Sequence, residues 1–142
     1  MPVLLENRNI SKVIDSAIID SCIKRFAKES NLMAVWILGS AVTDRLRDDS
    51  DVDFALYYRP GSQLDLAAYG QLVFDLERIL GRTVDLGRLS SRNVVYAVQA
   101  TQNGKLIFAP DPQEAIAFAS RMQSLYLDLK QDRKIVEEAY CA

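Results

Sequence analysis

Seven consecutive apolar residues at positions 32–38 (LMAVWIL) limit most strongly what this chain can fold into. A run of this length, rich in strand-forming side chains, is typical of a β-strand covered on both faces. Residues 51–58 (DVDFALYY) alternate instead, so that one face is apolar and the opposite face begins with Asp51 and Asp53. We therefore expect two strands in succession, the second with acidic side chains on one face.

Further elements are indicated by helical or alternating spacing of apolar residues along the rest of the chain. They are helices at 11–29 with Ser11 as a candidate cap, at 64–80 ended by Gly81, at 91–102 and from Asp111 onward, and strands at 83–89 and 105–109. This order predicts a single α/β (α+β) domain over residues 1–142, in which about four strands form a small mixed sheet and helices pack mainly on one face. The C-terminal helix from about 112 is expected to belong to the core or to face a partner.

The composition sets limits on the class of protein. With 49% hydrophobic and 25% charged residues, the 142 residues suit one globular domain. A net charge of -2 gives no general attraction for phosphates, so a broad nucleic-acid-binding surface is excluded. No apolar run approaches the roughly 18 residues of a membrane span, and the first ten residues do not resemble a signal peptide. We therefore expect a cytoplasmic protein without a membrane partner.

The chain contains no histidine. This absence excludes Ser-His-Asp and Cys-His catalytic pairs, histidine-ligated zinc and imidazole bases. Any catalysis must depend on carboxylates, hydroxyl groups and a bound metal ion.

Three acids are candidates for such a metal site. Asp51 and Asp53 would project from the same face of their strand, roughly 6 to 7 Å apart, and Asp85 would join them if its strand is a neighbour. Like charges about 4 Å apart repel by roughly 4 kcal/mol at an effective dielectric constant of ~20, so converging carboxylates either take up protons or gather a divalent cation. Oxygen ligands favour Mg²⁺ or Mn²⁺, and metals held by acids suit phosphoryl and nucleotidyl transfer.

Gly39 and Ser40 end the first strand and would supply the other half of the site. Glycine lets the backbone approach a phosphate, and Ser40 offers a hydroxyl group at the start of a helical turn whose free N–H groups attract anions. Each residue also has a plainer interpretation, because Asp-x-Asp pairs often begin strands and a serine often caps a helix. Their combination favours a corner that holds phosphate opposite acids that hold a metal ion.

The segment 39–53 (GSAVTDRLRDDSDVD) carries a family resemblance. Gly-Ser, ten residues and Asp-x-Asp is the pattern of the DNA polymerase β-like nucleotidyltransferase superfamily, and Asp85 in TVDLGRL resembles its third acid. In size the chain is similar to the minimal nucleotidyltransferases (MNT) that are paired with HEPN-domain RNase toxins. The resemblance covers residues 32–89. The rest of the chain resembles the family only in the order of its expected helices and strands.

This resemblance implies a polymerase β-like nucleotidyltransferase fold and the function of an antitoxin in a type VII-like toxin–antitoxin pair. Such an antitoxin transfers AMP from ATP, with Mg²⁺ or Mn²⁺, to a tyrosine hydroxyl group of a partner HEPN toxin in a hetero-oligomer. By the same likeness, Gly39 and Ser40 would hold the nucleotide phosphates. Asp51 and Asp53 would ligate the metal ions, and Asp85 would complete the catalytic ion and help to deprotonate the incoming hydroxyl group.

The chain departs from its relatives at two positions. Many of them have a basic residue three places after the serine and a glycine one place later, where this chain has Thr43 and Asp44. A negative side chain near a triphosphate lowers affinity unless it points away, and Arg45 and Arg47 either compensate or form a solvated face. Two alternatives therefore stay open, a non-catalytic antitoxin that neutralises its partner by binding and a small-molecule nucleotidyltransferase.

Overall fold

Residues 14–39 and 51–141 are described in the computed structural model of the chain, with the side chain of residue 141 left out. Four strands form one sheet in the order β3-β2-β1-β4. They are β1 (Leu32–Leu38), β2 (Val52–Tyr58), β3 (Val84–Arg88) and β4 (Lys105–Phe108). β1 is antiparallel to both β2 and β4, whereas β3 runs parallel to β2. The predicted small mixed sheet is confirmed.

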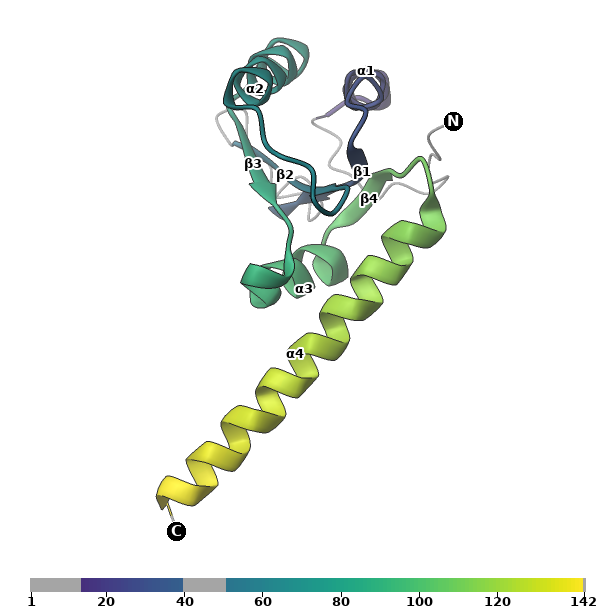
Figure 1. Cartoon of the computed structure of the whole chain (residues 1–142). Coiled ribbons are helices and arrows are strands. Elements are labelled where there is room, and N and C mark those ends of the chain that lie inside the picture. The colour runs from purple at the N-terminus through teal and green to yellow at the C-terminus, as the bar shows by residue number, and fades with distance from the viewer. Residues whose placement is uncertain (1–13, 40–50, 142) are drawn as a thin grey trace.

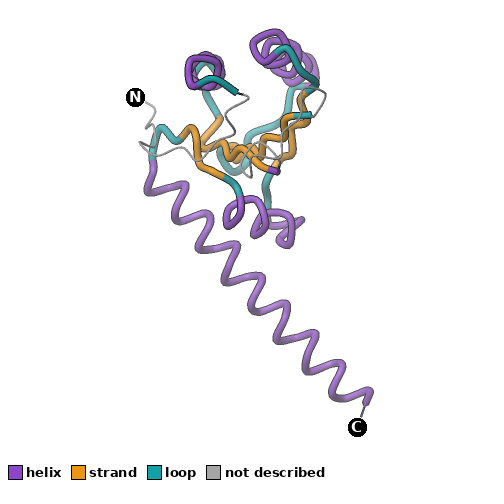
Figure 2. Tube along the Cα trace, turned by 180° about the vertical axis from the view of Figure 1, so that it is seen from behind, coloured by secondary structure: helices purple, strands orange, loops and turns teal. Residues whose placement is uncertain are grey.

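Helices cover both faces of this sheet, as Figure 1 shows from one side and Figure 2 from behind. The helices are α1 (Ser16–Phe26), α2 (Leu66–Leu80), α3 (Val94–Asn103), which follows the short 3-10 helix η2 (Ser91–Asn93), and α4 (Pro112–Cys141). The first two pack on one face and the last two on the other. This differs from the expected packing mainly on one face, and the reason is that the central strands are apolar on both faces.

Two hydrophobic cores result from this arrangement. The core under α1 and α2 holds Phe26 against Phe54, with ring centroids 5.3 Å apart. The core under α3 and α4 holds Trp36, Tyr57 and Phe118, and the last two rings stack at 3.9 Å. Because the middle of the sheet is buried on both sides, polar chemistry is confined to its ends and rims.

Helix ends follow local capping rules, and three helices begin later than expected: α1 at residue 16, α2 at Leu66 rather than 64, and α3 at Val94 rather than 91. The Asp15 carboxylate accepts a hydrogen bond from the backbone two residues on, so α1 begins at residue 16 rather than at the start of the expected range 11–29. The candidate cap Ser11 lies outside the described residues. Gly81 ends α2 with a φ of 67°, as predicted, and Asp111 caps α4. None of the described helices has both the length and the apolar composition needed to cross a membrane.

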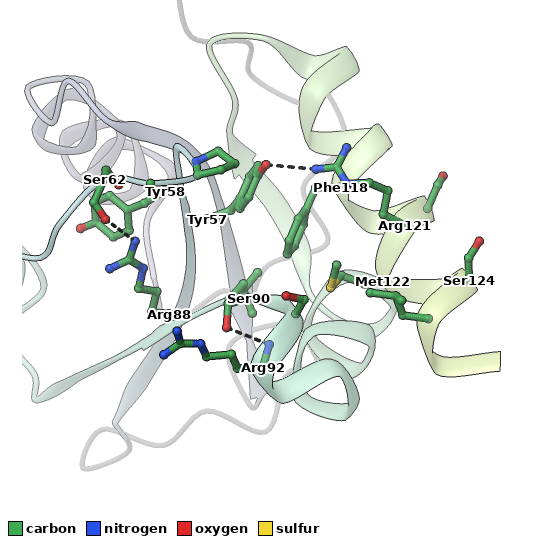
Figure 3. A pocket seen from close by; sticks show the side chains of 16 residues that line it. Tyr57, Tyr58, Ser62, Arg88, Ser90, Arg92, Phe118, Arg121, Met122 and Ser124 are labelled. Atoms are coloured by element: carbon green, nitrogen blue, oxygen red, sulfur yellow. Dashed lines mark hydrogen bonds between the residues drawn. The ribbon is translucent and has the colours of Figure 1, made fainter. Parts of the chain in front are cut away.

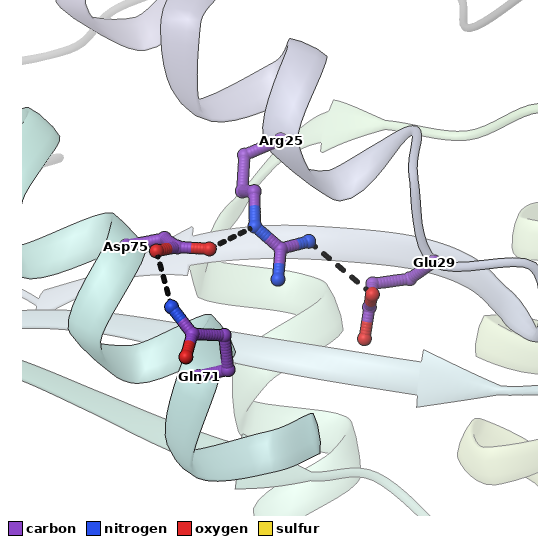
Figure 4. A network of polar contacts seen from close by, with 4 residues as sticks. All are labelled: Arg25, Glu29, Gln71 and Asp75. Carbon is purple, nitrogen blue, oxygen red and sulfur yellow. Dashed lines mark hydrogen bonds and ion pairs between the residues drawn. The ribbon is translucent and has the colours of Figure 1, made fainter. Parts of the chain in front are cut away.

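A polar network ties α1 to α2 (Figure 4). Arg25 Nε donates to Asp75 Oδ2 at 2.7 Å, and its Nη1 donates to Glu29 at 3.2 Å. Gln71 donates to the second Asp75 oxygen at 2.8 Å. The hydrogen bond from Arg25 lowers the pKa of Asp75, so this carboxylate stays ionised, and keeps its contact between the two helices, to a lower pH than an ordinary aspartate would.

Gly104, between α3 and β4, is a position where any side chain would be costly. A Cβ there would overlap the Leu38 side chain and come within 2.5 Å of the Ala100 carbonyl oxygen. Since its φ of -80° suits alanine, the cost is steric alone. We expect Gly104→Ala to lower the free energy of unfolding by about 2 to 3 kcal/mol, measured by urea denaturation.

Gly70→Ala is the matched control, because this glycine lies inside α2 and no atom is within 4 Å of an added Cβ. Alanine favours the helix, so the control variant should gain about 0.5 to 1 kcal/mol. Equal destabilisation of both variants would contradict the steric account of Gly104.

Candidate active site

The parallel pairing of β2 and β3 brings two of the predicted acids together. Asp53 lies directly across from Asp85 in the register of the two strands. Their side chains share the sheet face that α3 and α4 cover further along, where Ala55 and Tyr57 are buried. The condition under which Asp85 would join the acids of the second strand, that its strand is a neighbour, is therefore met.

Asp51 lies at the edge of this pair rather than between its members. It precedes β2, and its carboxylate accepts a hydrogen bond from Thr83 Oγ1, just before β3. Among the described side chains, no three acids, cysteines or histidines are arranged to hold a metal ion. The structure thus joins Asp53 with Asp85 and keeps Asp51 close by with a partner of its own.

The electrostatics of Asp53 favour a cation. Burial raises the pKa of this carboxyl group, and the negative charges of Asp85 and Asp51 raise it further, as does a hydrogen bond with Asp85. The ionised form of Asp53 is therefore less favourable than that of an ordinary aspartate, and a nearby positive charge would offset this cost. Carboxylate oxygens on one strand face fit a hard divalent cation such as Mg²⁺ or Mn²⁺.

Gly39 forms a corner without a side chain next to Asp53. It follows β1, whose last residue Leu38 pairs with Asp53, and it has a φ of 66°. A Cβ at this position would lie 3.3 Å from Asp53 Oδ2. The glycine therefore keeps open the space beside the carboxylate, as a bound phosphate would require.

Part of the predicted corner is beyond the structural description. Ser40 lies outside the described residues, and so do the two departures from the family pattern, Thr43 and Asp44, and the two arginines that could compensate for them, Arg45 and Arg47. The role of Ser40 at the nucleotide phosphates stays a prediction.

Two tyrosines near the acids were missed by the sequence analysis. The hydroxyl group of Tyr96 on α3 lies against Gly87, two residues after Asp85 on the same strand face. Tyr69 on α2 donates to the Leu86 carbonyl oxygen of the edge strand β3 at 2.6 Å. Burial raises the pKa of both hydroxyl groups, and Asp85 adds to the effect. Gly87, inside the expected strand 83–89, was a signal for such a contact in the sequence, because a glycine within a strand often marks a position that another group approaches closely.

The raised pKa of Asp53 leads to a prediction for titration. By carboxyl-carbon NMR, Asp53 should titrate above its ordinary value of 3.8. Mg²⁺ should lower the pKa because a nearby cation stabilises the ionised form. The pKa of Asp53 is higher in the folded chain than in the unfolded chain, so its protonated form stabilises the fold. This contribution to the free energy of unfolding is complete below pH 3.8 and is lost as the pH rises through the folded pKa.

Asp85→Asn provides the control for this titration. It should bring the Asp53 pKa down without abolishing the elevation, because burial is the larger cause. An Asp53 pKa that responds neither to Mg²⁺ nor to the Asp85 variant would contradict the electrostatic account.

Comparison with known proteins agrees with this architecture. The family model described as "Polymerase beta, Nucleotidyltransferase" matches residues 20–113, more than half of the chain. No curated protein matches the sequence.

Several solved structures share the fold. A chain of the MntA–HepT toxin–antitoxin crystal structure has a TM-score of 0.67 at 24% identity, with 90% of this chain and 100% of that chain covered. A toxin–antitoxin structure with AMP-PNP has a TM-score of 0.69 at 24% identity, with coverage of 91% and 100%. A chain in the structure of the tri-AMPylated Shewanella oneidensis HEPN toxin in complex with MNT antitoxin has a TM-score of 0.69 at 25% identity. The match covers 91% of this chain and 100% of that chain.

Proposed function

Because the chain belongs to the polymerase β nucleotidyltransferase family, we propose that it is the antitoxin of a type VII-like toxin–antitoxin pair and transfers AMP from ATP to a tyrosine hydroxyl group of a HEPN toxin. The observation that carries the proposal is the Asp53–Asp85 pair beside the open corner at Gly39. Similar solved structures support it, since one contains an AMPylated HEPN toxin and another contains AMP-PNP.

The described residues have separate tasks in this reaction. Asp53 and Asp85 would hold Mg²⁺ or Mn²⁺, joined by Asp51 once its carboxylate exchanges Thr83 for the ion. The metal, when bound, would neutralise the phosphates of ATP and activate the acceptor hydroxyl group. The tyrosine oxygen then bonds to the α-phosphate, and the bond to the β-phosphate breaks with release of pyrophosphate. Asp85 would accept the proton of the incoming tyrosine hydroxyl group, and Gly39 would leave room for the phosphates of ATP.

The proposal is tested by intact-mass spectrometry of the cognate HEPN toxin after incubation with the purified chain, ATP and Mg²⁺. We expect the toxin mass to rise by one or more AMP units, and by none when EDTA replaces Mg²⁺. Peptide mapping should place the added group on a tyrosine. An unmodified toxin that still binds the chain would contradict the proposed transfer.

A non-catalytic antitoxin is the second candidate, and one observation favours it. Asp51 already has a hydrogen-bond partner in Thr83, and the described acids form no ready-made metal site. Under this alternative, a chain with both Asp51→Asn and Asp53→Asn should still protect cells from the toxin. Loss of protection with normal complex formation would exclude it.

A further inference from the structure

A cavity of about 1010 Å³ lies away from the acids, at the other end of the strands (Figure 3). Its walls come from the end of β2 and the loop that follows, the end of β3, η2 and α4. Tyr57, in its wall, is four residues beyond Asp53 on β2, or about 13 Å along the strand. None of the three candidate acids lines the cavity, so it is separate from the candidate active site.

The lining of the cavity is positively charged. Its 16 residues include three arginines and five serines but no acidic residue. The whole chain has 19 acidic and 17 basic residues, so this lining differs in sign from the protein as a whole. Guanidinium and hydroxyl groups together are suited to phosphate oxygens.

The three arginines come from three elements. Arg88 on β3 donates to the Ser62 carbonyl oxygen at 3.0 Å, and Arg121 on α4 pairs with Glu114 at 3.4 Å. The exposed Arg92 side chain has no partner among the described residues. Figure 3 shows Arg88 and Arg92 on one side of the cavity and Arg121 on the other. Separated cations fit phosphates spaced along a strand better than one isolated phosphate group.

We propose that this cavity binds a short single-stranded polynucleotide through successive phosphates. The apolar side chains of Met122 and Leu125 line the α4 wall and would contact sugars and bases. The Tyr57 and Phe118 rings are buried against each other, so they support the wall and do not stack on bases. The site does not depend on the proposed AMP transfer.

The test uses fluorescence anisotropy with a labelled oligouridylate, in EDTA so that the metal-dependent site stays inactive. We expect the logarithm of the binding constant to fall with the logarithm of the salt concentration at a slope of about -1.4. This is the value for two phosphate contacts to a single strand, at Arg88 and Arg92, because Glu114 already neutralises Arg121. Arg92→Gln should weaken binding about fivefold and reduce the slope by about 0.7.

Arg78→Gln is the matched control, because this arginine lies on α2 over the Phe74 ring, outside the cavity, and loses the same charge. It should bind like the unaltered chain. Absence of binding, equal binding by Arg92→Gln, or displacement of the strand by equimolar inorganic phosphate would each overturn the proposal.

Discussion

Replacing Asp53 by Asn should abolish AMP transfer to the toxin, with a rate loss of at least about a thousandfold. Asp53 is the described acid closest to the open corner at Gly39, and it pairs with Asp85 across the two parallel strands. Asn keeps the shape of the side chain but removes the negative charge that a divalent cation needs. The measurement is the rate of AMP incorporation, followed by intact mass of the toxin.

The fold should tolerate this change. Because burial and the neighbouring carboxylates make the ionised Asp53 unfavourable, Asp53→Asn should leave the melting temperature at neutral pH unchanged or raise it. Asp65→Asn is the matched control, since Asn also caps a helix and Asp65 caps α2, which packs on the sheet face opposite to that of Asp53 and Asp85. A rate within tenfold of the unaltered chain would place the chemistry elsewhere.

Gly39→Ala should cost about a hundredfold in the rate of transfer. The added methyl group would lie 3.3 Å from Asp53 Oδ2 and would occupy the space that we assign to the phosphates of ATP. Displacement of a reacting group by about 1 Å is enough for an effect of this size. The positive φ of 66° adds a stability cost of about 1 kcal/mol.

Gly81→Ala separates these two effects. Its φ of 67° is nearly the same, but no atom lies within 4 Å of an added Cβ. Both variants should lose similar stability in urea denaturation, and only Gly39→Ala should lose activity. If Gly81→Ala lost as much activity, the effect at Gly39 would reflect stability and not the site.

The local pattern predicted the parts of the candidate site but not all of their partners. The spacing from Gly39 to Asp53 and the alternation in β2 were readable because they depend on neighbours in the chain. Thr83, which bonds to Asp51, lies 32 residues further along the chain. Tyr96, which covers Gly87, reaches β3 from the helix that follows it. No periodicity in the sequence indicates such contacts.

The packing of the helices was also predicted only in part. The two-sided burial of β1 was expected from its continuous apolar run, and the structure agrees. The helices were nevertheless expected mainly on one face, and the placement of α1 and α2 on one face and of α3 and α4 on the other depended on how the chain crosses the sheet.

The sequence by itself determined the strands, the end of α2 at Gly81, the start of α4 at Asp111 and the family pattern, because these follow from the identities of residues close together in the chain. The parallel register that sets Asp53 opposite Asp85, the corner at Gly39 beside them and the separate cavity lined by arginines were decided only by the tertiary structure. The physical reason is that strand register and helix placement minimise the free energy of the whole chain, in which contacts between distant segments outweigh local preference.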